Sequence, residues 1–224
     1  MSHKQLPKVV LVGFNKCATR SFSQLFERAG HASLHHKIRK PLQPSRTAAK
    51  RMKENIEGNR PVFEGFDDYV FYCDLVHVTP EEFFEGNSAY KEILKDYSDT
   101  LIILNLRDQD DWIRSRLRHG HGEFAKRYMS ALGLDNLDDL AAHWRQDWDE
   151  QLKGVREFMD DKPEQYFEFN IDTDNIEDLI SALPDYQLDA CHWGDSGNSR
   201  FRKLGPVSKR AKKVWANMRP RSTN

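Results

Sequence analysis

A short segment near the amino end of the 224-residue chain combines residue types that can bind an anionic ester. Lys16 supplies a mobile positive charge, and the hydroxyl groups of Thr19 and Ser21 can donate hydrogen bonds. The residues around these three are small, polar or positively charged: Asn15, Cys17, Ala18 and Arg20. Ammonium, hydroxyl and main-chain N–H donors grouped in one loop suit a phosphate or a sulfate ester.

The segments on either side of this loop are predicted to be a buried strand and an amphipathic helix. Residues 9–12 form a β-branched and apolar run, typical of a strand in a parallel sheet, and Gly13 ends it. Apolar residues at positions 22, 25, 26 and 29 share one helix face before Gly30. A loop placed in this way presents backbone N–H groups at the positive end of a helix, although an ordinary turn with a solvated lysine is the alternative interpretation.

A second pair of residues with the right chemistry lies further along the chain. Arg107 ends another buried run, residues 101–106, and Ser115 follows eight residues later in a predicted helix. If both side chains point toward the strand end, a guanidinium and a hydroxyl converge there and suit a phosphate monoester. The alternative is that Arg107 only pairs with Asp108 or Asp111.

Both patterns resemble motifs of the sulfotransferases that use 3′-phosphoadenosine 5′-phosphosulfate (PAPS). The order G-x-x-K-x-A-T-R-S resembles their 5′-phosphosulfate loop, and the arginine–serine pair resembles their 3′-phosphate motif. The family usually has proline two places after the arginine, where this chain has Gln109. The loop is not a Walker A motif, because no glycine directly precedes Lys16 and no serine or threonine directly follows it. With looser similarity to microbial members, the resemblance spans most of residues 8–198.

The resemblance implies a three-layer α/β fold similar to P-loop NTPases and transfer of a sulfuryl group to a hydroxyl or amine, leaving adenosine 3′,5′-bisphosphate. Lys16 would contact the sulfonate and the bridging oxygen, residues 15–21 would hold the 5′-phosphate, and Arg107 with Ser115 would hold the 3′-phosphate. Arg202 and Lys203 resemble part of a third PAPS-contacting segment, but the glycine directly after it and a later aspartate–tryptophan are missing. The family needs no metal, and no Mg²⁺ ligand set is apparent.

The acceptor in such a reaction must lose a proton to a general base. Asp74 is the preferred candidate, because a carboxylate that closes a central strand would face the same crevice as Lys16. The remaining candidates are Glu64, His77, Asp67 and His36. Asp74 could instead cap the turn that it begins.

Strand-like and helix-like segments alternate along the chain, which predicts a parallel sheet with helices on both faces. The further strands are expected within residues 31–36, 69–73, 101–106 and 166–169. Ser45 and Thr79 are expected to begin helices, the latter because proline and two glutamates follow it. Ligands of such sheets lie outside the carboxyl ends of the strands, where Lys16, Asp74 and Arg107 fall.

The length and composition predict one domain over residues 1–224, with a basic segment at 200–224. No apolar run could span a bilayer, and the first residues, MSHKQLPK, lack the apolar region of a secretory signal, so a cytoplasmic protein is expected. The three cysteines are widely spaced without a C-x-x-C pair, which argues against a disulfide framework or a zinc ribbon.

Two rival functions remain open at this level. One is a P-loop-type kinase that uses ATP and Mg²⁺, and the other is a non-enzymatic nucleotide- or nucleic-acid-binding module acting through residues 200–224. That basic segment could also be a solvated tail or could reach an anion held near Lys16. The sequence favours the sulfotransferase, with a small molecule or a carbohydrate among the acceptors it leaves open, and it does not decide whether the protein forms a homodimer.

Overall fold

A five-stranded parallel sheet forms the centre of the computed structural model, which describes residues 6–38 and 46–194. The strand order is β2-β5-β1-β8-β9, and every neighbouring pair is parallel. The bounds are Val9–Leu11 for β1, Ser33–His35 for β2, Phe71–Cys73 for β5, Leu101–Leu106 for β8 and Tyr166–Asn170 for β9. The parallel sheet expected from the alternating sequence pattern is confirmed.

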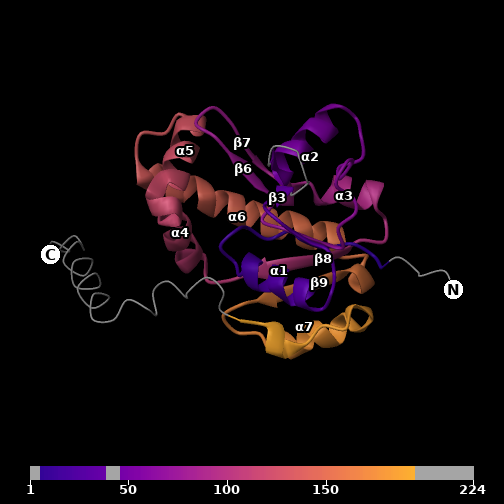
Figure 1. The fold of residues 1–224 in the computed structure, drawn as a ribbon. Coiled ribbons are helices and arrows are strands. Elements are labelled where there is room, and N and C mark those ends of the chain that lie inside the picture. The colour runs from indigo at the N-terminus through magenta and orange to yellow at the C-terminus, as the bar shows by residue number, and fades with distance from the viewer. Residues whose placement is uncertain (1–5, 39–45, 195–224) are drawn as a thin grey trace.

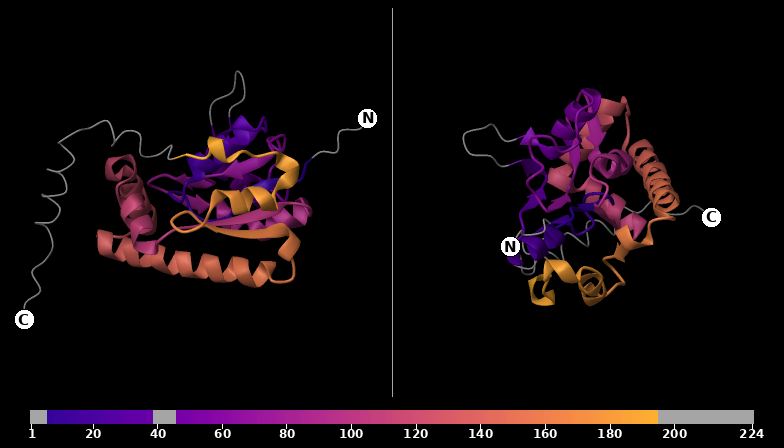
Figure 2. Two further views of the ribbon diagram at one scale, coloured as in Figure 1. Left: turned by 90° about the horizontal axis from the view of Figure 1, so that it is seen from below. Right: turned by 90° about the vertical axis from the view of Figure 1, so that its right-hand side faces the viewer.

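Helices cover both faces of the sheet and complete the three-layer arrangement (Figures 1 and 2). The helices are α1 (Thr19–Arg28), α2 (Ala48–Glu57), α3 (Tyr90–Asp96), α4 (Gln109–Leu117), α5 (Glu123–Leu132), α6 (Leu137–Met159) and α7 (Ile176–Ala182). Short 3-10 turns are η1 (Gly86–Ser88), η2 (His119–Gly122), η3 (Pro163–Gln165), η4 (Pro184–Tyr186) and η5 (Ala190–His192). In the part of the chain that the structure describes, no helix has the length and apolar character of a membrane span.

The alternation of side chains along β1 explains the two layers. Val9 and Leu11 pack with residues of α1 and α7 on one face, whereas Val10 packs with residues of α2, α3 and α6 on the other. Both faces of the strand are therefore buried, as its continuous apolar run predicts. Residues along α4 and α5 and in the first part of α6 form a third apolar cluster with Phe14 and Cys17 of the loop that follows β1.

Two small antiparallel hairpins lie beyond the main sheet, and one of them corrects the predicted helix at Thr79. One hairpin pairs β3 (Lys37–Ile38) with β4 (Arg46–Thr47), and the other pairs β6 (Val76–Val78) with β7 (Phe83–Glu85). The Thr79 hydroxyl accepts hydrogen bonds from the amides of Glu81 and Glu82, at 3.3 and 3.2 Å, and so closes a turn. The predicted helix at Thr79 is therefore wrong: a turn lies there, and the aromatic residues after it pack as the strand β7.

The start of α2 is also later than predicted. Thr47 is its N-cap, with the hydroxyl accepting from the amide of Lys50 at 3.3 Å, whereas Ser45 lies outside the described residues. The Thr47 side chain therefore satisfies one of the donors that a helix start leaves unpaired.

A buried amide side chain joins β8 to the loop after β1. Asn105 is fully buried, accepts a hydrogen bond from the amide of Gly13 at 3.0 Å, and donates to the carbonyl of Cys17 at 2.8 Å and of Phe14 at 3.4 Å. A Cβ atom on Gly13 would lie 2.1 Å from the main-chain oxygen of Asn105, so only glycine fits at this approach. The first turn of the loop is thus fixed by its neighbouring strand.

Replacing Asn105 with alanine should lower the free energy of unfolding by about 3 kcal/mol, because it leaves several buried polar groups without partners. The matched control is Asn87→Ala, since Asn87 is also buried but its side chain makes one longer bond, 3.4 Å to the carbonyl of Val12. We expect a loss of about 1 kcal/mol for the control. Urea denaturation measures both values, and equal losses would contradict a special role for Asn105.

Candidate active site

The later part of the segment between β1 and α1, up to the first turn of α1, presents several backbone N–H groups without partners in the described part of the chain. Lys16 and Ala18 have φ angles of 71° and 58°, a left-handed conformation that non-glycine residues rarely adopt. Ala18 is the N-cap of α1 and makes no capping hydrogen bond through its side chain. Within residues 6–38 and 46–194, the amides of residues 16 and 18–20 have no hydrogen-bond acceptor. The loop therefore has the donors expected of an anion site.

Most carbonyl groups of the same segment accept hydrogen bonds from other parts of the protein. Those of residues 14–19 each accept a hydrogen bond, and the donors are the Asn105 side chain, the indole of Trp112, the guanidinium of Arg107, the amides of Ser21 and Phe22, and the thiol of Cys73. Because each peptide unit directs its carbonyl and its N–H to opposite sides, this arrangement turns the N–H groups outward.

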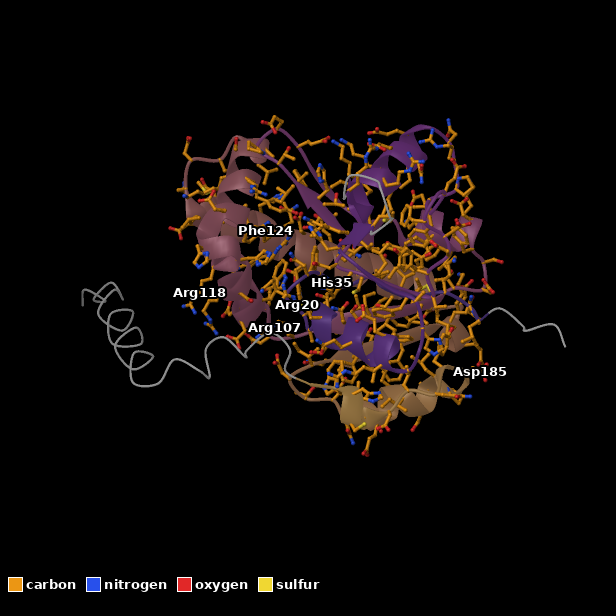
Figure 3. All side chains as sticks on the ribbon, in the orientation of Figure 1. Arg20, His35, Arg107, Arg118, Phe124 and Asp185 are labelled. Carbon is orange, nitrogen blue, oxygen red and sulfur yellow. The ribbon has the colours of Figure 1, made fainter. Side chains whose placement is uncertain are left out.

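Positive charge collects around the loop. Burial lowers the pKa of Lys16, the negative charge of Asp74 acts in the opposite direction, and the charges of Arg20 and Arg107 lower it further. Figure 3 shows Arg20 and Arg107 near His35 at this edge of the sheet. Burial also raises the pKa of Cys17 to about 12, so this loop residue is a neutral thiol packed in the apolar cluster.

Two loop hydroxyls have protein partners. The hydroxyl oxygen of Thr19 lies 3.2 Å from Nε2 of His35, and the hydroxyl of Ser21 donates to the carbonyl of Gly194. Asn15 is buried, and its Oδ1 atom has no hydrogen-bond partner in the described part of the chain. These residues occupy the loop and the first turn of α1, as the sequence predicts.

Arg107 follows β8 and reaches across to the loop. Its Nη1 donates to the carbonyl of Lys16 at 3.1 Å, and its Nη2 lies 3.8 Å from a carboxylate oxygen of Asp111. Its Nε atom is buried, and no described residue accepts a hydrogen bond from it. The ion pair considered as the alternative from sequence is therefore present, but it uses only part of the guanidinium.

Ser115 lies on α4, and the next residue, Arg116, holds this helix against the core. The Arg116 side chain is fully buried, pairs with Glu85 of β7, donates to the hydroxyl of Tyr128 at 3.2 Å, and lies 4.6 Å from the ring centroid of Trp144. Ser115 is only partly buried on the same helix. No hydrogen bond joins Ser115 to Arg107 among the described contacts.

Asp74 lies at the carboxyl end of β5 beside two imidazoles. One of its carboxylate oxygens is 3.6 Å from Nε2 of His35 and 3.9 Å from Nδ1 of His36. Its charge is the strongest of those acting on Lys16, so the carboxylate and the ammonium share one electrostatic environment. The structure thus brings together Lys16, Asp74 and His36 of the residues selected from sequence.

The remaining candidate bases lie elsewhere or have other partners. Glu64 pairs with Arg60 at 3.3 Å, and the carbonyl of Asp67 accepts from Lys8, which precedes β1 at the opposite edge of the sheet. His77 lies on β6, with Nδ1 3.1 Å from the Thr47 hydroxyl and Nε2 3.5 Å from Glu82. Burial lowers its pKa. Arg202 and Lys203 lie outside the described residues.

Two histidines near the loop were not identified as candidates from the sequence. Burial lowers the pKa of His35, and the charge of Asp74 opposes that effect. Burial also lowers the pKa of His119 in η2, where Lys16 acts in the same direction and Asp74 against it. The position of His35 at the end of a predicted strand was the available signal, because strand ends of a parallel sheet meet at one edge.

A comparison with protein families agrees with the motifs. A family model described as a sulfotransferase domain matches residues 8–186. The matched region includes the loop at Lys16, the cluster at Asp74, and Arg107 with Ser115. The search of curated proteins found no match.

Replacing Lys16 with methionine should raise the free energy of unfolding and remove protection of the fold by sulfate. Because burial disfavours the charged form of Lys16, as its lowered pKa indicates, an uncharged side chain of similar length removes a destabilising term near neutral pH. An anion that binds only the folded state raises its stability, and this gain needs the ammonium.

The measurement is thermal denaturation at pH 7 with and without sodium sulfate. Lys126→Met is the matched control, because Lys126 is exposed on α5 and pairs with Glu123 on the same helix. We expect the control to keep the protection by sulfate, and equal protection of Lys16→Met would contradict the assignment of the anion site.

Proposed function

Because the chain belongs to the sulfotransferase family, we propose that it transfers a sulfuryl group from PAPS to a hydroxyl or amine acceptor. The product nucleotide is then adenosine 3′,5′-bisphosphate. The observation that carries the proposal is the loop after β1, whose carbonyls are bound from inside while its N–H groups are directed outward. Backbone donors of this kind bind an anion without needing a side chain at each position.

The residues present fit a nucleotide with anionic groups at two places. The amides of residues 16 and 18–20 would hold the 5′-phosphate at the start of α1, and the hydroxyls of Thr19 and Ser21 would exchange their present partners, His35 and Gly194, for it. Arg107 retains a buried Nε–H without a partner among the described residues, and Ser115 follows on α4, so these two would hold the 3′-phosphate. Guanidinium and hydroxyl donors are suited to a monoester dianion.

Lys16 is the proposed electrostatic catalyst. When bound, PAPS supplies an electrophilic sulfur and a phosphate leaving group. The Lys16 ammonium would lie against the sulfonate and the bridging oxygen, where negative charge develops during transfer. Burial makes this charge more effective than an exposed lysine, because fewer water molecules screen it.

The cluster around Asp74 is the proposed place of proton removal. Asp74 lies in the electrostatic environment of Lys16, whereas Glu64 and His77 are paired with other side chains. An acceptor bound between Asp74 and Lys16 would have its nucleophile near a base and its target sulfur near the ammonium. A small molecule or a carbohydrate hydroxyl is the acceptor we expect.

Calorimetric titration with adenosine 3′,5′-bisphosphate, without Mg²⁺, tests the donor site. We expect micromolar binding to the wild type and a loss of about tenfold to a hundredfold in Arg107→Ala, since a hydrogen bond to a charged group contributes about 1.5–3 kcal/mol. Adenosine 5′-monophosphate lacks the 3′-phosphate, so its affinity should fall less in the same variant, through the lost hydrogen bond from Arg107 to the carbonyl of Lys16 alone.

Arg114→Ala is the matched control, because Arg114 lies on the exposed face of α4 and pairs with Asp111. Its nucleotide affinity should equal that of the wild type. Absence of binding by adenosine 3′,5′-bisphosphate, together with Mg²⁺-dependent binding of ATP, would overturn the proposal in favour of a P-loop-type kinase.

A further inference from the structure

The parallel pairing of β2 with β5 places two imidazoles next to a carboxylate. His35 is opposite Cys73 in the register, so His36 and Asp74 are the first residues beyond the paired ends of these strands. The amide of His36 donates to the carbonyl of Cys73 at 3.2 Å and keeps the two chain ends together. The contact between His36 and Asp74 is therefore a consequence of strand register.

The contacts of His36 favour one of its two neutral tautomers. Its Nδ1 atom lies 3.4 Å from the main-chain carbonyl oxygen of Asp74 and 3.9 Å from the carboxylate. A carbonyl oxygen can only accept a hydrogen bond, so this contact favours the neutral tautomer with its proton on Nδ1 and a lone pair on Nε2. The side chain is 33% exposed, and within residues 6–38 and 46–194 no hydrogen bond uses its Nε2 atom.

The backbone holds this geometry at an energetic cost. His36 and Asp74 both have left-handed conformations, with φ angles of 65° and 56°. Such conformations are unfavourable for a non-glycine residue and persist where the surroundings enforce them. The carbonyl of His36 accepts from the amide of Ala48 at 2.8 Å, so the N-terminus of α2 fixes the peptide from the other side.

The neighbouring groups are less able to accept a proton from an acceptor. Nε2 of His35 is occupied by the Thr19 hydroxyl at 3.2 Å, and burial lowers the pKa of that imidazole. The Asp74 carboxylate lies 3.6 Å from Nε2 of His35 and 3.9 Å from Nδ1 of His36 and interacts with the charge of Lys16, so neighbouring groups of the site already surround it. His119 is the remaining rival, and burial together with Lys16 lowers its pKa.

We propose that Nε2 of His36 takes the proton from the acceptor and that Asp74 is the residue that positions His36, an inference that rests on the proposed sulfuryl transfer. In this step the acceptor O–H or N–H bond breaks, and its proton moves to Nε2. The acceptor atom forms a bond to sulfur while the bond from sulfur to the bridging oxygen breaks. The electron pair of that bond leaves on the 5′-phosphate beside Lys16, and the Asp74 carboxylate stabilises the imidazolium.

The first test measures the tautomer and needs no turnover. Protein labelled with ¹⁵N in its histidine rings is studied by NMR, and the signal of His36 is identified by its loss in His36→Asn. Asparagine is chosen because it tolerates the left-handed conformation at this position. The expected result is a neutral ring with its proton on Nδ1. A proton on Nε2 would overturn the proposal.

The second test measures transfer to water as the probe acceptor, by release of labelled sulfate from PAPS. His36→Asn should lower the rate by about 10²- to 10⁴-fold, the contribution typical of general-base catalysis. Asp74→Asn keeps the main-chain carbonyl that favours this tautomer, so it should lower the rate less. Imidazole added to His36→Ala should restore part of the rate, which a structural role would not predict.

The matched control is His143→Asn, because His143 forms another histidine–aspartate pair, 3.2 Å from Asp147 on α6, and is not part of the site. It should keep the wild-type rate. A larger loss in Asp74→Asn than in His36→Asn, or loss only in His119→Asn, would overturn the assignment of His36.

Nucleotide binding separates this inference from the proposed function. His36→Asn should bind adenosine 3′,5′-bisphosphate as tightly as the wild type and unfold at a similar temperature. If the wild type does not bind this nucleotide, the proposed function fails. If both proteins bind it and His36→Asn retains full transfer, only the role of His36 fails.

Discussion

The side chain of Asn105 is the constraint on which the loop between β1 and α1, the donor loop, depends. It is buried in β8 and binds one amide and two carbonyls of the loop, so the neighbouring strand determines the path of the loop. Arg107 and Trp112 complete this set from the segment after the same strand. Because these donors use the loop carbonyls, the N–H groups are left for a ligand. Anion recognition in this chain is therefore built from peptide groups whose orientation is enforced from the core.

Strain is concentrated at the same edge of the sheet. Lys16 and Ala18 in the loop, and His36 and Asp74 across from it, all have left-handed conformations without being glycine. Each costs free energy that the surrounding hydrogen bonds and packing must offset. The charge of Asp74 acts on the pKa of Lys16, so the donor loop and the cluster of His35, His36 and Asp74 influence each other electrostatically.

Apolar periodicity predicted the parallel sheet because each central strand is buried on both faces, and residue spacing located Lys16, Asp74 and Arg107 at its carboxyl edge. The strand end at His35 could be located from the sequence, but its contact with Asp74 could not, since the adjacency of β2 and β5 is a tertiary feature that no local pattern specifies. The sequence at Thr79 predicts a helix because a capping residue, a proline and two acids can begin either a helix or a turn. Only the packing of the aromatic residues that follow distinguishes the two, and here they form a strand. The family model confirms membership and leaves the role of each residue to experiment.

The three cysteines differ in a way that makes the native chain convenient for spectroscopy. Cys17 and Cys73 are buried, and burial raises the pKa of both thiols, whereas Cys191 is exposed in η5. A thiol-reactive fluorophore should therefore attach at Cys191 alone, although the hydrogen bond with Asp189 raises the pKa of Cys191 and slows the reaction. Gly194, three residues further on, accepts a hydrogen bond from Ser21 at the start of α1. A dye at this natural position would report changes at the donor loop without any engineered cysteine.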